Sequence, residues 1–427
     1  MKKFLALIIA LVMALSLVAC GEQKQPDTPD VPDGDDQQTA TVKVGFITLH
    51  DENSTYDLNF INAAKEAIAN LGLTDADYIL KTNVPEGQEC YETAMNLVDE
   101  GCNIIFADSF GHEPYMIDAA KEHPEVQFCH STGTRAHTEN LANYHNAFAS
   151  IYEGRYLAGV AAGLKLNEMI EAGQFTADEA KMGYVGAYTY AEVVSGYTSF
   201  FLGARSVCPT VTMDVTFTGS WYDETLEKEG AEKLIQGGCK LISQHADSLG
   251  APTACENAGV PNVSYNGSTK DACPNTFIVS SRIDWAPYYE MCIKAVMDGT
   301  EIPADWTGTL ATGSVVLTDV NETAAAAGTA EAIAAATEKL EKGEIHVFDC
   351  STFTTKVDDK VNTFKADYLK LDETGHITSY MADVDTDAAY TGDTEVIKDG
   401  YFAESEFRSA PYFDLEIDGI TRLDTKM

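Results

Sequence analysis

In the middle of the chain, the stretch "KLISQHADSLGAPTACENAGV" joins an apolar run to a cluster of polar side chains. Gln244, His245, Asp247 and Ser248 follow Leu241–Ile242, and a helix-like segment comes next. Amide, imidazole, carboxyl and hydroxyl groups can hydrogen-bond the edges of a small polar molecule. Because parallel sheets present ligand-binding residues beyond their carboxyl ends, we expect this cluster to line a cleft.

Polar and aromatic residues recur at the ends of at least six other apolar runs. Each of them has a plainer reading as a helix cap, a core aromatic or a solvated loop residue. Their repeated position at strand ends nevertheless favours a shared binding cleft. The candidate ligand-binding residues chosen from these positions are Asp108, Phe110, Tyr190, Trp221, His245, Asp247, Asn266, Arg282, Asp284 and Trp285.

The sequence lacks the common signatures of catalysis. It contains no phosphate-binding G-x-x-x-x-G-K-[ST], no dinucleotide-binding G-x-G-x-x-G, no G-x-S-x-G and no H-E-x-x-H. The acidic stretch "DVDTDAAYTGDT" begins like a calcium loop, but Ala388 replaces the required Gly and Thr394 the bidentate Glu. We therefore expect a binding protein with no catalytic residue, no cofactor and no metal.

Strand-like and helix-like segments alternate from Val42 onward. The pattern "VKVGFITL", "NFINAAKEAIANLG", "YILKTNV" continues to a long small-residue helix, "NAFASIYEGRYLAGVAAGLKL", and then restarts. Strands separated by single helices build doubly wound parallel sheets, so the pattern predicts an α/β protein with two lobes. The last 84 residues are expected to be looser and rich in strands.

The N-terminus has the features of a secretory signal. Lys2 and Lys3 precede the apolar run "FLALIIALVMALSLVA", which is short and lies at the extreme N-terminus, so it predicts a signal peptide over residues 1–19. The run Leu17-Val18-Ala19-Cys20 resembles a bacterial lipobox, which predicts lipidation of Cys20, with palmitate among the acyl groups, and anchoring to the cell membrane. Residues 20–40 are rich in Asp, Pro and Gln and predict a disordered tether.

The chain is strongly acidic, with a formal net charge of −39. Removal of the signal leaves 26 basic against 67 acidic residues, a net charge of −41. Such a chain is repelled by nucleic acid and by anionic lipid, so we expect no nucleic-acid partner and membrane contact only through the lipid. Apart from Cys20, nine Cys remain, and this odd number argues against a complete disulfide framework.

Several segments resemble the basic membrane protein family, the purine nucleoside receptor-like, substrate-binding lipoproteins of ABC importers. The resemblance rests on "KVGFITLHDENSTYDLNFINAAKEA", "YEGRYLAGVAAGLK", "MGYVGAY", "TFTGSWYDETLEKEGAEKLIQGGCKLISQHADS", "EIHVFDCSTF" and "FRSAPYFDLEIDGI", in this order. It implies a type I periplasmic-binding-protein-like fold, with two doubly wound parallel-sheet lobes joined by three crossovers. It also implies a purine nucleoside or nucleobase held between aromatic rings.

The resemblance adds further candidate residues. The first-loop pattern of the family matches Asp57, Asn59 and Phe60, and its second-lobe aromatic matches Trp221, so Phe60 and Trp221 are expected to clamp the ligand. Base–aromatic stacking contributes about 1–3 kcal/mol per base. Two positions depart from the family. Asn266 stands where its nucleoside binders usually carry Asp, and only Arg282, out of register, is available near the place of a family Lys.

We expect four parts in the chain. Residues 1–19 form the signal and residues 20–40 the tether. Lobe 1 consists of residues 41–145 with 283–312, and lobe 2 of residues 146–282 with 313–427.

The leading hypothesis is a monomeric, lipid-anchored extracytoplasmic receptor that closes on a purine nucleoside or base and delivers it to ABC permease subunits. One alternative is a sensor of the same fold that reports to a membrane signalling partner. Another is a surface nucleoside hydrolase in which Asp108 or His245 acts as acid or base.

Overall fold

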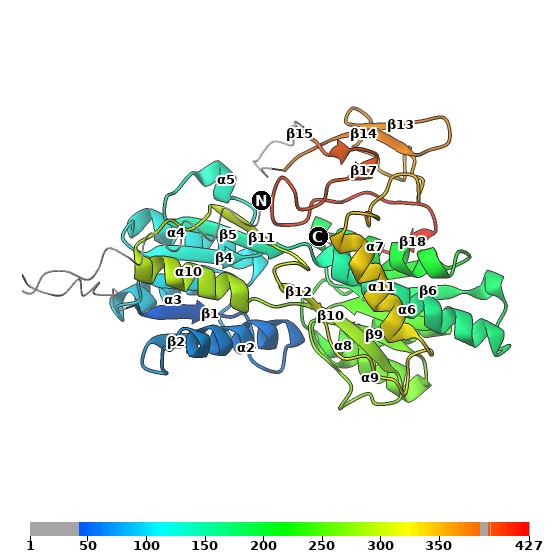
Figure 1. Ribbon diagram of the computed structural model, residues 1–427, viewed down its shortest axis with the longest axis horizontal. Helices are drawn as coiled ribbons and strands as arrows, with labels where there is room; N and C mark the ends of the chain where they lie inside the picture. Colours follow the sequence, from blue (N-terminus) through cyan, green and yellow to red (C-terminus); the bar gives the residue numbers. More distant parts are fainter. Residues whose placement is uncertain (1–41, 385–391, 393, 427) are drawn as a thin grey trace, which may run out of the picture. The chain divides into compact units, whose positions relative to one another are not determined.

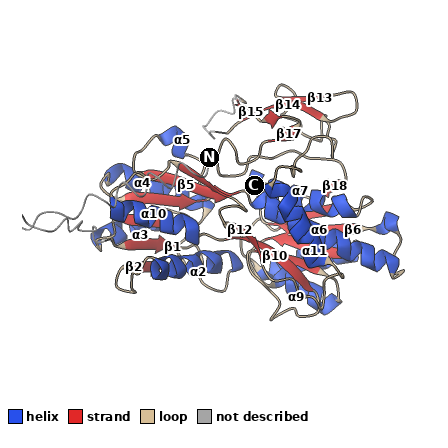
Figure 2. Cartoon of the chain, in the orientation of Figure 1, coloured by secondary structure: helices blue, strands red, loops and turns tan. Residues whose placement is uncertain are grey.

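The computed structural model describes residues 42–384, 392 and 394–426 (Figure 1). The predicted signal peptide, Cys20 and the tether lie outside the described residues, as does most of the acidic stretch 383–394. Residues 40–427 form one compact unit. Figure 2 shows that helices cover the faces of two separate sheets in this unit, as the alternating sequence pattern predicts.

The sheet of lobe 1 contains six parallel strands in the order β11-β5-β4-β3-β1-β2. Its central strands are apolar along their whole length and fully buried, which is typical of strands covered on both faces. The strands are β1 (Val44–Ile47), β2 (Tyr78–Lys81), β3 (Ile104–Ala107), β4 (Gln127–Ser131), β5 (Tyr144–Ala149) and β11 (Asp305–Gly308).

Helices pack on both faces of this sheet. One core layer joins α2 and α10 to the sheet and the other joins α3 and α4 to it. The elements are α2 (Thr55–Asn70), α3 (Gln88–Asp99), the 3-10 turn η1 (Phe110–His112), α4 (Glu113–Glu122), α5 (Ala136–Glu139) and α10 (Ala286–Asp298).

The sheet of lobe 2 has seven strands in the order β12-β10-β9-β8-β6-β7-β18. All neighbours in it are parallel except β10 and β12, which pair antiparallel. The strands are β6 (Lys181–Gly186), β7 (Thr212–Phe217), β8 (Leu241–His245), β9 (Asn262–Tyr265), β10 (Phe277–Ile283), β12 (Val315–Leu317) and β18 (Ile420–Arg422).

The helices of lobe 2 form two layers around that sheet, α6, α7 and α11 in one core cluster and α8 with α9 in another. Small residues in the long helix α6 let it approach α7 closely, because a Cβ added at Gly159 would meet the Phe200 carbonyl oxygen at 2.0 Å. The helices are α6 (Ile151–Glu171), the 3-10 turn η2 (Ala177–Glu179), α7 (Ala191–Val207), α8 (Glu224–Gln236), α9 (Gly250–Ala258) and α11 (Thr329–Glu341).

The chain passes between the lobes three times, as predicted, from β5 to α6, from β10 to α10, and from β11 to β12. Backbone hydrogen bonds tie these passages together. The amide of Ser150 donates to the Gly308 carbonyl at 2.8 Å, and the amide of Asp284 donates to the Ser314 carbonyl at 2.7 Å. The hinge is therefore a bundle of three hydrogen-bonded segments.

Residues 344–426 form what we call the C-terminal extension. Its short strands build small antiparallel pairs, and its last strand, β18, joins the sheet of lobe 2 beside β7. The other strands are β13 (Leu369–Leu371), β14 (Ile377–Ala382), β15 (Thr394–Glu395), β16 (Ile397–Lys398) and β17 (Tyr401–Phe402). None of the helices in the described part of the chain combines the length and apolarity that a membrane span requires.

Candidate functional site

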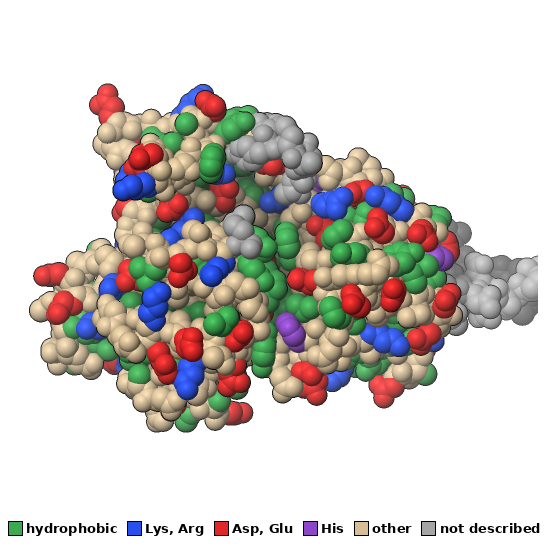
Figure 3. All heavy atoms as spheres, turned by 180° about the vertical axis from the view of Figure 1, so that it is seen from behind, with side chains coloured by type: hydrophobic (Ala, Val, Ile, Leu, Met, Phe, Trp, Pro, Cys, Tyr) green, Lys and Arg blue, Asp and Glu red, His purple; other side chains and the backbone are tan. Residues whose placement is uncertain are grey.

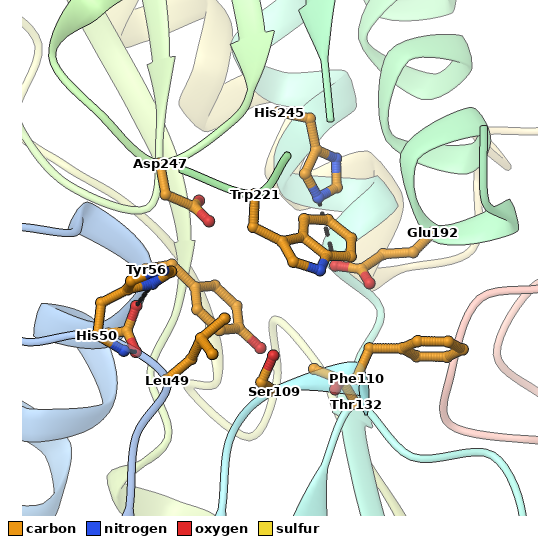
Figure 4. Close-up of a pocket in the computed structure, with 11 residues that line it drawn as sticks. Leu49, His50, Tyr56, Ser109, Phe110, Thr132, Glu192, Trp221, His245 and Asp247 are labelled. Atoms are coloured by element: carbon orange, nitrogen blue, oxygen red, sulfur yellow. Dashed lines mark hydrogen bonds and ion pairs between the residues drawn. The ribbon is translucent and has the colours of Figure 1, made fainter. Parts of the chain in front are cut away.

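A small cavity lies between the carboxyl ends of the two sheets, with about 360 Å³ of space when its opening to solvent is included. Its walls come from strand-end loops and helix starts of both lobes, as Figure 4 shows. The lining contains three carboxylic acids and no Lys or Arg. The lining residues are Leu49, His50, Tyr56, Asp57, Ser109, Phe110, Thr132, Glu192, Trp221, His245 and Asp247.

Trp221 forms the aromatic wall on the lobe 2 side. It follows β7 in a loop and is half-buried, and its ring reaches into the cavity (Figure 4). The edge of Tyr188 supports it, with ring centroids 5.1 Å apart, and Tyr190 lies 6.1 Å away. The Trp221 carbonyl accepts a hydrogen bond from the amide of Asp247 at 3.0 Å, so this loop and the loop after β8 hold each other.

His245 and Glu192 form a polar pair beside the Trp221 ring. The Nε2 atom of His245 lies 3.3 Å from a carboxyl oxygen of Glu192 (Figure 4). Burial lowers the pKa of His245 although the bond to Glu192 opposes this shift, and the nearby Arg155 adds to the lowering. A neutral His245 with its proton on Nε2 donates to Glu192, which then has one further oxygen to offer to a ligand.

A stack of rings and a cation supports His245 from behind. The His245 ring lies 4.7 Å from the ring of Tyr265, and the buried guanidinium of Arg155 lies over Tyr265, 3.2 Å from the ring centroid. Arg155 donates to the Gln244 carbonyl at 3.1 Å. The end of β8, where the sequence places its polar cluster, is thus held rigidly at the cavity floor.

Asp247 contributes a buried carboxyl group to the same wall. Burial, followed by the charge of Asp57, raises the pKa of Asp247 well above its usual value. The side-chain amide of Asn266 lies 3.5 Å from the Asp247 carboxyl, and Asn266 itself has the left-handed φ of 65° that Asn tolerates. The Asp247 carbonyl accepts from the amide of Thr55 at 3.0 Å, which joins lobe 2 to the start of α2.

On the lobe 1 side, Asp57 organises the loop between β1 and α2. Its carboxylate accepts from the amide of His50 at 2.7 Å and from the hydroxyl of Ser54 at 2.6 Å, and it lies 3.3 Å from the His50 ring. Ser54 in turn caps α2 by accepting from the amide of Asp57. Asp57 lines the cavity, but much of its hydrogen-bonding capacity is used within the loop.

Tyr56 and Asp108 complete the lobe 1 wall. The Tyr56 hydroxyl donates to the Asp108 carbonyl at 2.6 Å, and its ring faces the cavity. One carboxyl oxygen of Asp108 accepts from the amide of Leu49 at 3.1 Å, while the other is buried without a partner. Burial, followed by the charge of Asp57, raises the pKa of Asp108 well above its usual value.

Five predicted site residues lie together at the second passage between the lobes and do not line the cavity. Phe60 is buried and stacks on Trp285, with ring centroids 4.6 Å apart. Asn59 donates to the Ile283 carbonyl and accepts from Arg282 at 3.4 Å. Asp284 accepts from the amide of Ala286 at 3.1 Å and pairs with Arg282 at 3.5 Å. We call these residues the hinge cluster.

The structure thus groups the predicted residues in two places. Five of them line the cavity, three more lie directly around it, and five form the hinge cluster. Whether any of them contacts a ligand stays a prediction. The cavity group is Asp57, Phe110, Trp221, His245 and Asp247. The group around it is Asp108, Tyr190 and Asn266, and the hinge cluster is Asn59, Phe60, Arg282, Asp284 and Trp285.

Sequence reasoning did not select Glu192 and Tyr56, which line the cavity from the second residue of α7 and of α2. Both follow strand ends by several residues, so a search extended into the first helical turn would have found them. His50, Ser109 and Thr132 also line the cavity and stand directly after strands. Among the described residues, no group of three or more His, Cys, Asp or Glu side chains is arranged to hold a metal ion.

The protein has two α/β lobes that are joined by three segments, with a polar and aromatic cavity between them. This arrangement defines a ligand-binding protein of the periplasmic-binding type. The chain belongs to the Bmp family of PnrA-like ABC transporter substrate-binding proteins, which matches residues 45–349. The predicted family is therefore confirmed, and so is the expectation that the protein is not an enzyme. Substrate-binding proteins of ABC transporters act outside the cytoplasm with permease partners.

Relatives support this assignment. The chain is 33% identical over 262 residues to a purine-binding protein of Brucella abortus, covering 61% of this chain and 70% of the relative. It is 31% identical over 258 residues to a putative ABC transporter glucose-binding protein of Haloferax volcanii, covering 60% of this chain and 62% of the relative. The fold resembles that of a solute-binding protein from Conexibacter woesei, with a TM-score of 0.58, 20% identity, and coverage of 71% and 98% of the two chains. The predicted fold class is confirmed.

Proposed function

We propose that this protein is a lipid-anchored receptor that captures a purine nucleoside or nucleobase between its lobes and delivers it to an ABC importer. The observation that carries the proposal is the composition of the cavity, in which Tyr56 and Trp221 reach in from opposite lobes among Asp57, Glu192 and Asp247. Aromatic rings stack on the flat faces of a purine, and carboxylates accept from its N–H edges and from hydroxyls.

The cavity lining contains no Lys or Arg, and this restricts the charge that a ligand can carry. Three acidic side chains without a lining cation disfavour a phosphate or a carboxylate. A neutral or cationic ligand with several N–H or O–H donors matches this lining. The relative named as purine-binding supports a purine, while the relative named as glucose-binding makes a sugar the obvious competitor to test.

The binding site is proposed to include all the predicted residues of the cavity and its surroundings, together with Tyr56 and Glu192. The hinge cluster is proposed to act on closure, since it joins α2 to the passage between β10 and α10. We retain the predicted division into signal, tether, lobe 1 and lobe 2. The sheet membership of β5, β10, β11 and β12 supports the boundaries between the two lobes to within a few residues.

Calorimetric titration tests the ligand. The chain from residue 41, unfolded and refolded to remove bound ligand, is titrated with adenosine, guanosine, inosine, uridine, adenine, guanine, xanthine and glucose. Saturable one-to-one binding of a purine compound is expected. Binding of glucose alone, or of none of these compounds, would overturn the proposal.

The lipid anchor is tested separately. The full chain should fractionate with the membrane and incorporate labelled palmitate, and Cys20→Ser should abolish both. A Cys20→Ser chain that still incorporates palmitate would contradict lipidation at this residue.

A further inference from the structure

A second, larger compartment adjoins the cavity and shares Phe110, Thr132 and Glu192 with it. It contains about 1380 Å³ of space, including its open mouth. In the space-filling view, hydrophobic side chains gather along the furrow between the two lobes (Figure 3). The lining residues are Phe110, Gly111, Glu113, Pro114, Thr132, Thr134, Arg135, Phe148, Thr189, Tyr190, Ala191, Glu192, Arg408, Ala410, Pro411 and Asp414.

Three parts of the chain supply these walls. Lobe 1 contributes the residues around η1 and the loop after β4, and lobe 2 contributes the start of α7. Residues 408–414 of the C-terminal extension supply the third wall, and they lie beyond the segment 45–349 that matches the family.

The extension wall is fixed in place from both lobes. The amide of Ser409 donates to the Asp305 carboxylate of β11 at 2.7 Å, and the Ser409 hydroxyl donates to the same carboxylate. The Tyr152 hydroxyl of α6 donates to the Glu404 carbonyl at 3.2 Å. Because these bonds reach strands and helices of both lobes, the wall is a defined surface rather than a loose tail.

The charged groups on the lobe 1 side of the compartment are already paired. The Glu113 carboxylate accepts from the amides of Thr134 and Arg135 at 2.8 Å and from the Tyr144 hydroxyl at 3.0 Å. The Arg135 guanidinium pairs with Glu139 at 2.5 Å. Both groups are thus engaged by partners within the protein.

The same holds on the extension side. The Arg408 guanidinium donates to the carbonyls of Ala410 and Pro411 at 3.2 Å and to that of Val384 at 3.0 Å. The Asp414 carboxylate pairs with Lys365 at 2.5 Å. The remaining surface consists of aromatic faces, Pro and Ala side chains, Thr hydroxyls and the Glu192 carboxylate, which suits an uncharged group and gives no site for a phosphate.

We propose that this second compartment is a ligand subsite, walled by the C-terminal extension, that takes an uncharged and partly apolar substituent of the molecule whose flat ring lies against Trp221. The inference rests on the proposed function, because it assumes a purine ring in the first cavity. Phe110 and Glu192 line both spaces, so the compartment lies directly beside a ligand bound in the first cavity.

The experiment compares ligands with and without a substituent in a variant that fills the compartment. Ala191 is half-buried at the start of α7, so Ala191→Phe places a ring in the compartment without disturbing the lobe core. The matched control is Ala172→Phe, at the exposed end of α6. The full chain in detergent is titrated with adenine, guanine, their 9-benzyl derivatives, their ribonucleosides and the nucleoside 5′-monophosphates.

In Ala191→Phe, the substituted purines should lose about tenfold in affinity while the bare bases change by less than about twofold. In the unaltered chain the monophosphates should bind at least about tenfold more weakly than the nucleosides. Equal changes for bases and substituted purines, no change at all, or tight monophosphate binding would overturn the inference. If no purine compound binds the unaltered chain, the proposed function itself has failed.

The contribution of the extension is measured in the unaltered chain by hydrogen–deuterium exchange. The 9-benzyl purines should protect amides within residues 405–415 more strongly than the bare bases do. Ala410→Leu, which narrows the compartment from the extension side, should repeat the selective loss of affinity if it folds. Equal protection by bases and 9-benzyl purines would show that the extension does not wall the subsite.

Discussion

The cavity and the hinge cluster are built from the same kinds of residues but use them differently. In the cavity, Trp221 is half-buried and His245, Glu192 and Asp247 retain hydrogen-bonding capacity toward the enclosed space. In the hinge cluster, Phe60 and Trp285 stack on each other and are almost fully buried. Aromatic and acidic residues near strand ends thus serve recognition in one place and packing in the other.

This difference teaches that a position at a strand end brings a residue near the cleft without deciding where its side chain points. Phe60 lies only three residues after Asp57 in α2, so the two side chains are neighbours on the helix surface, yet their surroundings differ. Asp57 faces the cavity and Phe60 faces α10. The predictions below separate recognition from packing, beginning with the largest expected effect.

Phe60→Ala should reduce the free energy of unfolding by about 3–5 kcal/mol, because it removes a buried ring from the stack with Trp285. Purine affinity of the folded protein should change by less than about threefold. Denaturant unfolding and calorimetry measure the two quantities, and Phe364→Ala, at a 90% exposed ring, is the control. A large loss of affinity with unchanged stability would instead return Phe60 to the aromatic clamp predicted from the family resemblance.

Trp221→Ala should weaken purine binding by about 1–3 kcal/mol, because a stacking face is lost. Its stability should change by less than about 1 kcal/mol, since the ring is half-buried in a loop. Trp306→Ala is the matched control, because Trp306 stacks on Tyr288 in lobe 1, away from the cavity lining. Equal losses of purine affinity in Trp221→Ala and Trp306→Ala would show that the loss is not specific to the cavity.

Glu227 supports the cavity from behind by accepting from the amides of Ser248 and Asp223, and burial raises its pKa from 4.5 to about 7. The folded chain therefore binds more protons at this group between pH 4.5 and 7, and its contribution to stability is lost as the pH rises through this window. The loss is about 1.4 kcal/mol per pH unit within it.

We therefore compare the free energy of unfolding of Glu227→Gln with that of the unaltered protein at pH 5 and at pH 8, using denaturant unfolding. The difference should favour the variant more at pH 8 than at pH 5. Glu229→Gln, on the exposed face of the same helix, should show no such difference. A pH-independent effect of Glu227→Gln would show that this carboxyl titrates normally in the folded state.

Asp247 should give the smallest effect. Because the pKa of Asp247 is raised well above the ordinary value of 3.8, its carboxyl group ionises at a higher pH than usual. The ionised form is the stronger acceptor for ligand N–H and O–H groups. Purine affinity should rise by less than about tenfold from pH 5 to pH 8. Calorimetry of Asp247→Asn should show a flatter profile, whereas Asp271→Asn, at an exposed residue, should keep the slope. An unchanged slope in Asp247→Asn would assign the pH dependence to another group.

Much of the fold could be predicted because it follows from local patterns. Apolar strands, helical spacing and Gly stops determine the alternation of elements, and the loop after β8 indeed lies at the cavity. The sequence does not set Glu192 apart from other first-turn residues, because an acidic residue in the first turn of a helix is an ordinary favourable choice. Its role depends on His245, which is 53 residues away in the sequence.

The hinge cluster escaped prediction for a similar reason. The stack of Phe60 on Trp285 joins residues 225 positions apart, and periodicity within one helix cannot reveal such a partner. The extension was expected to be looser, rich in strands and part of lobe 2. Its contact from Ser409 to Asp305 and its place beside the compartment arise from long-range packing that its own sequence does not encode locally.

The central claim, that a purine ring stacks on Trp221, is tested most directly by intrinsic fluorescence. The chain contains three Trp, and of these Trp221 alone lines the cavity, while Trp285 is buried in the hinge cluster and Trp306 stacks on Tyr288. Titration with the purine that binds most tightly in calorimetry should quench the emission of the unaltered protein. The quench should disappear in Trp221→Phe, even though calorimetry still detects binding to that variant. A full quench in Trp221→Phe would place the ligand elsewhere and contradict the account.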